Sequence, residues 1–241
     1  MEKNNITYTA EEYARTKKES SFRDVVEMHT IFSLIGDPTG LYILDAGCGD
    51  GIYARELADH GAKHIMGADC AVDFIEMANK KNQDYEGRIE YRHAFVQDFP
   101  GKGDRDLVVG SFVLSYPRNL EEAVAYCQAM VSHLKDGGRF VGFNNNPFEV
   151  YNGERYEKYG FRKVMESSKE GAEVVYWVKG MTDPIVNFHL KPETYEKAFR
   201  DAGFSELQWK KVLLAPSEKG NPYWDEFFKD ESPFIAMLAK K

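Results

Sequence analysis

The nine residues from Ile43 to Gly51, ILDAGCGDG, constrain the fold of this chain more than any other segment. The apolar run 41–44 that leads into them predicts a buried strand, and the pattern of 52–60 that follows predicts a helix. Three glycines at alternate positions stand between the two. Because they lack a Cβ, they let the backbone turn sharply and approach a ligand closely. A strand, a glycine loop and a helix start predict the ligand-binding corner of a doubly wound α/β sheet.

The spacing of the glycines indicates which ligand this corner takes. A dinucleotide fingerprint needs G-x-G-x-x-G, but Ile52 stands where the third glycine of that pattern would fall. The carboxylate of Asp45, directly before the loop, would repel a diphosphate and suits a cationic ammonium. Asp69 ends the next predicted strand, where a carboxylate can accept hydrogen bonds from both ribose hydroxyls, or instead cap the following helix. We expect an adenosine ligand with a charged amino-acid end and no phosphates.

Asp45 to Gly51, followed by Asp69, resembles motif I and the ribose-binding acid of class I S-adenosylmethionine-dependent methyltransferases. The resemblance implies S-adenosylmethionine as cofactor and methyl transfer as the reaction. Two alternatives stay open at this point. One is a nicotinamide-binding domain, and the other is a relative that binds S-adenosylmethionine without catalysing transfer.

The order of predicted elements indicates an α/β fold. Helical periodicity over 9–35 predicts an N-terminal helical cap (residues 1–36). Beyond it, predicted strands and helices alternate, which favours a parallel sheet covered on both faces. The strands are expected at 41–46, 64–69, 88–94, 106–113, 138–144, 207–214 and 234–239, and the helices at 51–60, 71–82, 120–134 and 192–202.

With the resemblance, these elements predict a Rossmann-like, doubly wound, seven-stranded, mostly parallel sheet whose last strand is antiparallel. The turn residues Lys135 to Gly138 are expected to separate a helix from the fifth strand. Residues 148–190 break the alternation, with strand-like runs at 173–179 and 185–190, and are expected to form an antiparallel lid insertion. We expect residues 1–241 to be a single methyltransferase domain.

Composition bounds the partners of the chain. Its 241 residues carry a net charge of −8, which disfavours nucleic acid and leaves a small-molecule methyl acceptor as the expected partner. No apolar run reaches the ~18 residues of a membrane span, and the polar start of the chain does not resemble a signal peptide, so we expect a cytoplasmic protein without a membrane partner. The scattered histidines and cysteines predict no metal site. The oligomeric state stays open.

The resemblance also implies a set of cofactor contacts. Glycine backbone would approach the methionine moiety and ribose, Asp69 would hold the ribose hydroxyls, and Tyr8, Tyr13 or Arg23 would reach the carboxylate. The full set of expected cofactor-binding residues is Tyr8, Tyr13, Arg23, Asp45, Gly47, Cys48, Gly49, Gly51, Asp69, Cys70, Phe95, Val96, Ser111, Phe112 and Tyr116.

One position departs from the family pattern. At the end of the third strand, where an acid commonly faces the adenine amino group, the chain has the apolar Phe95 and Val96. Either Phe95 stacks on the adenine while backbone groups bind its edge, or Asp98 takes the polar role after a bulge.

Methyl transfer from a sulfonium needs orientation and exclusion of water more than a strong base, so no catalytic triad is expected. The candidate catalytic residues are Tyr116, whose alternative role is that of a turn residue before Pro117, and His189, whose alternative is a structural histidine. The amides of Asn144 to Asn146 either bind a polar heterocycle or hold a loop.

Three further segments narrow the resemblance: HTIFSLIGD before motif I, the run from Tyr195 to Lys211, and Pro222-Tyr223-Trp224. Together they resemble the toxoflavin-synthase-like branch of small-molecule methyltransferases. That branch implies transfer to a nitrogen or carbon of a heterocyclic or other secondary-metabolite acceptor.

Overall fold

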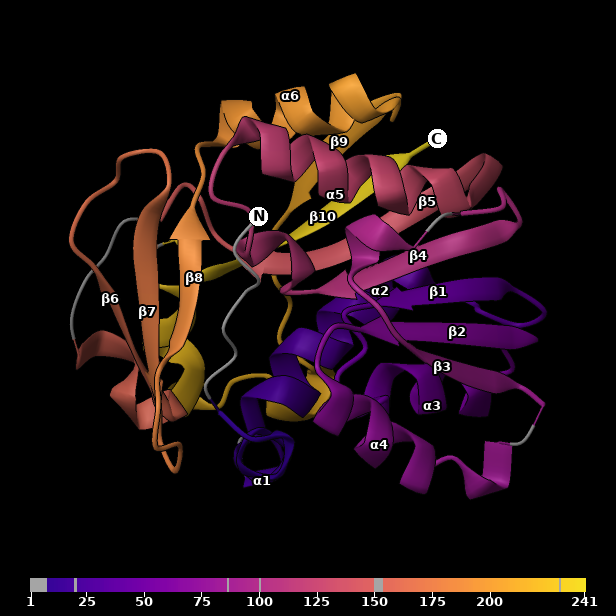
Figure 1. The fold of residues 1–241 in the computed structure, drawn as a ribbon. Coiled ribbons are helices and arrows are strands. Elements are labelled where there is room, and N and C mark those ends of the chain that lie inside the picture. The colour runs from indigo at the N-terminus through magenta and orange to yellow at the C-terminus, as the bar shows by residue number, and fades with distance from the viewer. Residues whose placement is uncertain (1–7, 20, 86, 100, 150–153, 230) are drawn as a thin grey trace.

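Seven strands form the main sheet of the computed structural model, which describes residues 8–19, 21–85, 87–99, 101–149, 154–229 and 231–241 (Figure 1). The strand order is β3-β2-β1-β4-β5-β10-β9. The bounds are β1 Tyr42–Ala46, β2 His64–Asp69, β3 Ile89–His93, β4 Arg105–Ser111, β5 Leu134–Asn145, β9 Glu206–Lys210 and β10 Phe234–Lys240.

The pairing of these strands confirms the expected sheet. β1 pairs in parallel with β2 and β4, β2 with β3, and β4 with β5, whereas β10 is antiparallel to both β5 and β9. One detail of the expectation was wrong. The turn expected at Lys135 to Gly138 lies inside β5, because the positive φ of Gly137 (78°) and a register shift opposite Arg105 and Leu107 absorb the bend without ending the strand.

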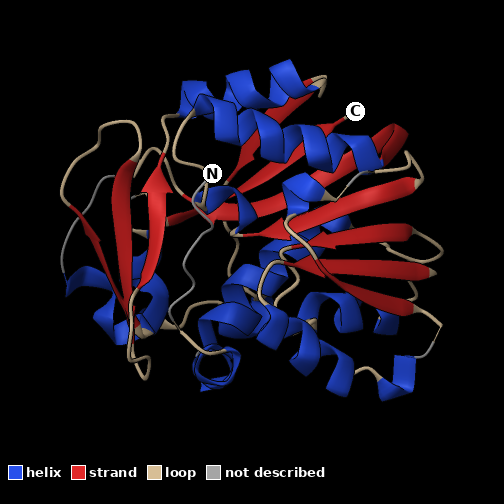
Figure 2. Ribbon diagram, in the orientation of Figure 1, coloured by secondary structure: helices blue, strands red, loops and turns tan. Residues whose placement is uncertain are grey.

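Helices cover both faces of the sheet (Figure 2). The N-terminal helices, a π-helical segment Arg23–Met28, α3 and α4 lie on one side, and α5 and α6 lie on the other (Figure 1). Their bounds are α1 Ala10–Glu19, α2 His29–Ile35, α3 Ile52–Asp59, α4 Val72–Lys80, α5 Leu120–His133, α6 Pro192–Ala202 and α7 Asp225–Phe228.

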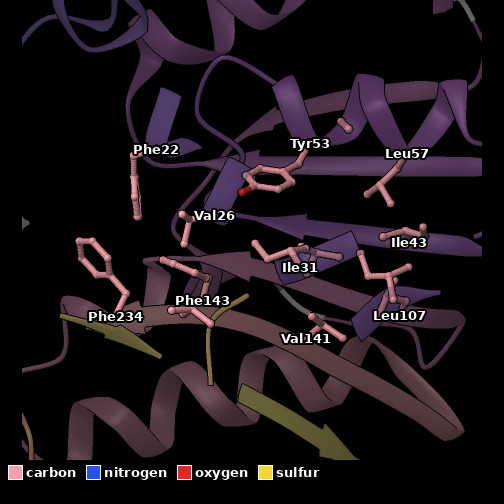
Figure 3. Close-up of a cluster of buried hydrophobic side chains, with 14 of the residues drawn as sticks. Phe22, Val26, Ile31, Ile43, Tyr53, Leu57, Leu107, Val141, Phe143 and Phe234 are labelled. Carbon is pink, nitrogen blue, oxygen red and sulfur yellow. The ribbon is translucent and has the colours of Figure 1, made fainter. Parts of the chain in front are cut away.

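Alternation along the strands divides the core into two layers. Ile43 belongs to the cluster under α2 and α3, together with Val26, Ile31 and Leu57 (Figure 3). The next residue, Leu44, belongs to the cluster under α5 and α6. Successive side chains of a strand point to opposite faces, so a central strand with two covered faces needs apolar residues at successive positions, as at Ile43 and Leu44.

Residues 161–189 form the expected antiparallel insertion, but with three strands instead of two. β6 Phe161–Met165, β7 Ala172–Val178 and β8 Ile185–His189 make a separate sheet in the order β6-β7-β8. β6 escaped prediction because its inward-facing set, Phe161, Lys163 and Met165, contains a lysine. That lysine hides the apolar alternation that marks a half-buried strand.

In the C-terminal part, the expected helix and the expected last strand are found, but the segment between them differs from the expectation. α6 starts at Pro192 and ends before Gly203, whose φ of 102° only glycine adopts readily. β9 ends at Lys210, four residues before its expected limit. The short helical turns Pro216–Glu218 and Pro222–Trp224, and helix α7, were not expected.

Candidate active site

The glycine loop joins β1 to α3 at the carboxyl end of the sheet. Gly47, Gly49 and Gly51 all have positive φ (71°, 53° and 77°), a conformation that residues with a Cβ adopt at a cost. Close packing adds a second constraint at Gly51, where a Cβ would lie 2.2 Å from the hydroxyl of Tyr91. Both constraints account for glycine at these positions.

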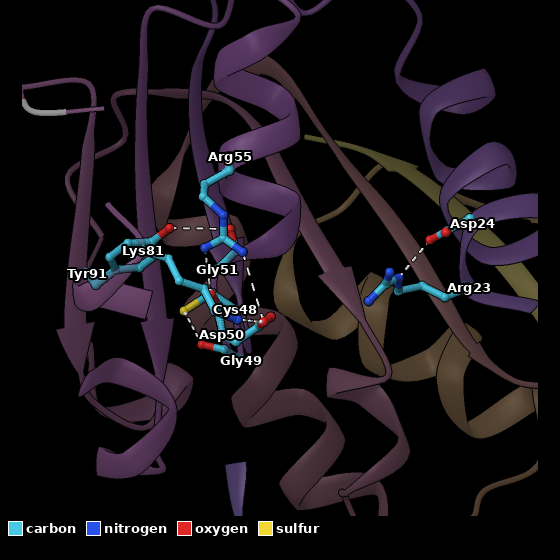
Figure 4. A network of polar contacts seen from close by, with 9 residues as sticks. All are labelled: Arg23, Asp24, Cys48, Gly49, Asp50, Gly51, Arg55, Lys81 and Tyr91. Atoms are coloured by element: carbon cyan, nitrogen blue, oxygen red, sulfur yellow. Dashed lines mark hydrogen bonds and ion pairs between the residues drawn. The ribbon is translucent and has the colours of Figure 1, made fainter. Parts of the chain in front are cut away.

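Two cations brace the loop from outside. Nζ of Lys81 lies 2.6 Å from Oδ2 of Asp50, and Arg55 donates to the Asp50 carbonyl at 2.7 Å (Figure 4). Asp50 therefore holds the outer side of the loop and leaves the inner backbone facing the end of β2.

Asp69 occupies the end of β2 as expected. Its Oδ2 accepts the N–H of Gly49 at 2.9 Å, and its Oδ1 accepts the N–H of Ala71 at 2.9 Å. Ala71, not Asp69, is the residue that precedes α4, so the alternative of a simple helix cap does not account for the bond to Gly49. Burial raises the pKa of Asp69. Each oxygen keeps a lone pair for a further donor, which fits the two hydroxyls of a ribose.

A cavity of about 100 Å³ opens beside the glycine loop, and we call it the donor cavity. The structure brings eleven of the fifteen expected cofactor residues to its wall: Tyr8, Tyr13, Gly47, Gly49, Asp69, Cys70, Phe95, Val96, Ser111, Phe112 and Tyr116. Sequence reasoning missed the other four lining residues, Phe74, Gln97, Val113 and Tyr126.

Gln97 follows the end of the third strand, the position where the sequence departs from the family pattern. Asp98 does not line the donor cavity, whereas Phe95, Val96 and Gln97 do. Oε1 of Gln97 is buried without a hydrogen-bond partner among the described residues. A buried acceptor in this state is costly unless a ligand completes it, and an adenine amino group supplies the required donor. Its one signal in the sequence is a lone amide two residues beyond Phe95.

Three expected residues lie behind the wall instead of in it. Asp45 is fully buried, its Oδ2 has no partner among the described residues, and burial followed by the charge of Asp69 raises its pKa to about 7. The side chain of Cys48 is buried, and burial raises its pKa well above the usual range of a thiol. Gly51 begins α3. These three residues support the glycine loop on its buried side and do not line the donor cavity.

Arg23 and His189 do not come to the site. Arg23 donates to Asp24 at 2.8 Å and lies apart from the glycine loop (Figure 4). His189 is buried in β8, lines neither this cavity nor the larger one described next, and has its pKa lowered by burial and by the charge of Lys163. The expected carboxylate contact of Arg23 and the expected catalytic role of His189 therefore have no support in the geometry.

A larger cavity of about 420 Å³ adjoins the donor cavity, and we call it the acceptor cavity. The two share Tyr8, Tyr13, Phe112 and Tyr116. Further lining comes from the N-terminal region, the small sheet and the C-terminal segment: Thr16, Ser21, Phe22, Glu157, Lys158, Tyr159, Gly160, Phe161, Tyr176, Val178, Lys179, Met181, Ile185, Asn187, Tyr223 and Phe234. The wall is mostly aromatic.

The shared wall is an aromatic partition. The rings of Tyr8 and Tyr13 stack at 5.5 Å, and Tyr13 meets Phe74 of α4 edge-on at 5.5 Å. Burial is the main cause that raises the pKa of Tyr8 and of Tyr116. Both hydroxyls therefore stay protonated at neutral pH, and Tyr116 is suited to hydrogen bonding and not to removing a proton.

Asn144 to Asn146 tie parts of the fold together. Nδ2 of Asn144 donates to the Tyr195 hydroxyl at 3.1 Å, and Asn145 donates to Asn187 at 3.2 Å. Asn146 donates to the Ser232 carbonyl at 2.8 Å. None of the three lines either cavity, so the geometry favours the loop-holding alternative.

The described residues lack the features of two other kinds of site. Those residues contain no group of three or more histidine, cysteine, aspartate or glutamate side chains that could hold a metal ion. In the same part of the chain, no helix combines the length and apolar character needed to cross a membrane.

Comparison with known proteins agrees with this geometry. Residues 43–138 match a family described as a methyltransferase domain. An uncharacterized protein of Haemophilus influenzae is 24% identical over 92% of this chain and 89% of its own length. A ubiquinone biosynthesis O-methyltransferase of Ruegeria pomeroyi is 30% identical over 73% of this chain, and the match spans 65% of that relative.

Solved structures share the fold. A putative S-adenosylmethionine-dependent methyltransferase from Listeria monocytogenes has 21% identity and a TM-score of 0.64, with 89% of this chain and 96% of that chain covered. Geranyl diphosphate C-methyltransferase from Streptomyces coelicolor, solved with S-adenosyl-L-homocysteine, has 14% identity and a TM-score of 0.61, with 89% and 74% covered.

The acceptor groups around the donor cavity fit a ligand that is cationic and rich in donors, as S-adenosylmethionine is. The fold, motif I and the family match together define a class I methyltransferase. The chain is an S-adenosylmethionine-dependent enzyme of that class, and the alternative of a nicotinamide-binding domain is thereby set aside.

Proposed function

We propose that this enzyme transfers the methyl group of S-adenosylmethionine to a nitrogen or carbon atom of a small, flat, heterocyclic or secondary-metabolite acceptor. The observation that carries the proposal is the wall shared by the two cavities. Because Tyr8, Tyr13, Phe112 and Tyr116 line both, an acceptor in the larger cavity lies directly beside the methyl donor. Proximity and alignment supply most of the catalysis that such a displacement needs.

Residues of the donor cavity divide the work of holding the cofactor. The backbone of Gly47 and Gly49 allows close approach, Asp69 accepts from the ribose hydroxyls, and Gln97 accepts from the adenine amino group. When bound, the cofactor supplies the electrophilic methyl group. The aromatic partition of Tyr8 and Tyr13 excludes water from the path between the cavities.

The composition of the acceptor cavity favours an acceptor that is already nucleophilic. Among the described lining residues, the only carboxylate is that of Glu157, which is exposed, and none is a histidine. The buried tyrosines stay protonated. A ring nitrogen or an electron-rich carbon can attack without losing a proton first, whereas a phenol needs a base.

The aromatic wall favours a flat ring system with a polar edge. Phe161, Tyr176 and Phe234 stack or tilt against one another at 5.4–5.9 Å, and all three line the cavity. Asn187 adds a buried amide to the same wall. The small sheet that carries two of these residues supports the proposed lid role of residues 148–190. Membership of the toxoflavin-synthase-like branch stays a prediction, as do the cytoplasmic location and the absence of nucleic-acid and membrane partners.

The test is turnover of a matched acceptor panel. Three bicyclic compounds of similar size, with a ring nitrogen, an indole carbon or a catechol oxygen as the reactive atom, are incubated with methyl-labelled S-adenosylmethionine, and products are assigned by mass spectrometry and NMR. Labelled nitrogen or carbon product is expected. Turnover of the catechol alone would replace the proposal by O-methylation, the activity named for the ubiquinone relatives.

A paired variant confirms that turnover comes from this site. Asp69→Ala should abolish most of the product, whereas Asp73→Ala, an exposed aspartate on the neighbouring helix, should not. Binding of S-adenosylhomocysteine without turnover of any of the three compounds would contradict the proposed acceptor class.

A further inference from the structure

A buried carboxylate lies one hydroxyl away from the donor cavity. Glu27 is only 2% exposed, and its Oε1 accepts hydrogen bonds from the Tyr53 hydroxyl at 2.9 Å and the Ser111 hydroxyl at 2.7 Å. Ser111 ends β4 and lines the cavity. Because a carboxylate is costly to bury, its retention at this place calls for a role beyond packing.

The strand order indicates which part of the methyl donor lies nearest to Glu27. Asp69, at the end of β2, and Gln97, after β3, mark the adenosine half of the cavity. Ser111 ends β4, on the opposite side of β1. A ligand with its adenosine over β2 and β3 therefore extends its sulfonium and amino-acid end toward Ser111. The sulfonium and amino groups at this end carry the positive charges of the ligand, and the only negative group there is the terminal carboxylate.

The backbone departs from regular geometry on both sides of this contact. Glu27 lies in the π-helical segment Arg23–Met28, a rare form that occurs mostly at functional sites. Phe112, directly after Ser111, has a φ of 59°, which is strained for an aromatic residue. The two irregular segments therefore meet at the Glu27–Ser111 contact.

We propose that Glu27 is a positioning residue that matches the charge of the methyl donor: through Ser111 it places a fixed negative charge beside the sulfonium end and favours the cationic donor over the neutral product, S-adenosylhomocysteine. Loss of the sulfonium charge on transfer then weakens the attraction and aids product release. The inference rests on the donor site and not on the acceptor class proposed above.

The test compares ligands that differ in charge at one atom. Sinefungin carries an amino group where S-adenosylmethionine carries its methylated sulfur, whereas S-adenosylhomocysteine is neutral there. We expect Glu27→Gln to weaken the binding of sinefungin and S-adenosylmethionine about tenfold and that of S-adenosylhomocysteine less than twofold, because the amide oxygen can still accept the hydrogen bonds of Ser111 and Tyr53 while the negative charge is lost. Affinities are measured by calorimetry without any acceptor, so failure of the acceptor proposal does not affect the result.

Glu11→Gln, the same change at an exposed position of α1, is the matched control and should leave all three affinities unchanged. An equal loss for all three ligands, or no loss, would overturn the proposal. If Glu27→Gln does not fold, as judged by thermal unfolding, Glu27→Asp replaces it. That variant keeps the charge, but its side chain is one methylene shorter, so the carboxylate lies farther from Ser111. It should weaken sinefungin more than S-adenosylhomocysteine, and an equal effect would again contradict the inference.

Discussion

The hydroxyls of Tyr8 and Tyr116 lie 3.4 Å apart, although 108 residues separate them in the chain. Tyr8 precedes the first helix, and Tyr116 follows the fourth strand of the sheet. Both residues line the donor and acceptor cavities, so their contact joins the N-terminal segment to the sheet in the wall that the two cavities share.

This contact predicts energetic coupling between the two tyrosines. Tyr8→Phe and Tyr116→Phe should each weaken S-adenosylhomocysteine binding, and the double variant should lose less than the sum of the two by about 0.5–1 kcal/mol. Calorimetry on the wild type, the two single variants and the double variant measures this coupling energy. Strict additivity would show that the hydroxyls do not interact in the complex.

Asp69→Ala should weaken S-adenosylhomocysteine binding by about 1–3 kcal/mol, because it removes a charged acceptor from the ribose and from the backbone N–H of Gly49. The control is Asp73→Ala, which should stay within about twofold of wild type, or roughly 0.4 kcal/mol. Unchanged affinity of the Asp69 variant would move the ribose site elsewhere.

Asp45 predicts a pH dependence of stability. Burial is the main cause that raises its pKa to about 7 in the folded protein. At any pH between the pKa of the unfolded chain and about 7, the carboxyl of Asp45 is therefore protonated in the folded state and ionised in the unfolded state. The resulting stabilisation is fully present at low pH and is lost as pH rises through about 7.

The measurement is urea unfolding of the ligand-free protein at pH 5.0 and 8.5. The free energy of unfolding should fall between these pH values by about 3 kcal/mol more in wild type than in Asp45→Asn, which cannot titrate, because about two pH units lie between pH 5.0 and the raised pKa of Asp45. Equal pH profiles for the two proteins would show that Asp45 is not perturbed.

Lys163 and Glu149 form an ion pair with 1% and 5% residue exposure, and Nζ lies 2.5 Å from Oε2. Lys163→Met should lower the free energy of unfolding by about 3–5 kcal/mol, because it leaves a buried charge without its partner. Lys163→Met combined with Glu149→Leu should recover most of this loss. Chemical denaturation measures both.

The exposed pair Lys197–Asp201 provides the control. Lys197→Met should change the free energy of unfolding by at most about 0.5 kcal/mol, since exposed pairs on a helix contribute little. A similar small effect at Lys163 would show that water reaches the buried pair.

Local patterns in the sequence were sufficient for the sheet. Apolar runs, glycine and proline positions marked all seven strands of the main sheet and most helices. The signal is strongest in the central strands, because a strand covered on both faces is mainly apolar whatever its neighbours are. The helix that starts at Pro192 and ends before Gly203 is one example. β6 was missed because Lys163 faces inward, and only its long-range partner Glu149 makes that position stable.

The same division holds at the site. The sequence by itself determined the glycine loop and Asp69, since positive φ angles and a carboxylate at a strand end are properties of neighbouring residues. Only the tertiary structure decided that Gln97 lines the donor cavity, that Glu27 lies behind Ser111, and that His189 lies outside both cavities. Such positions depend on contacts between residues far apart in the chain, as with Glu27 and Ser111, which are 84 residues apart. Chain folding creates these contacts, and no local pattern records them.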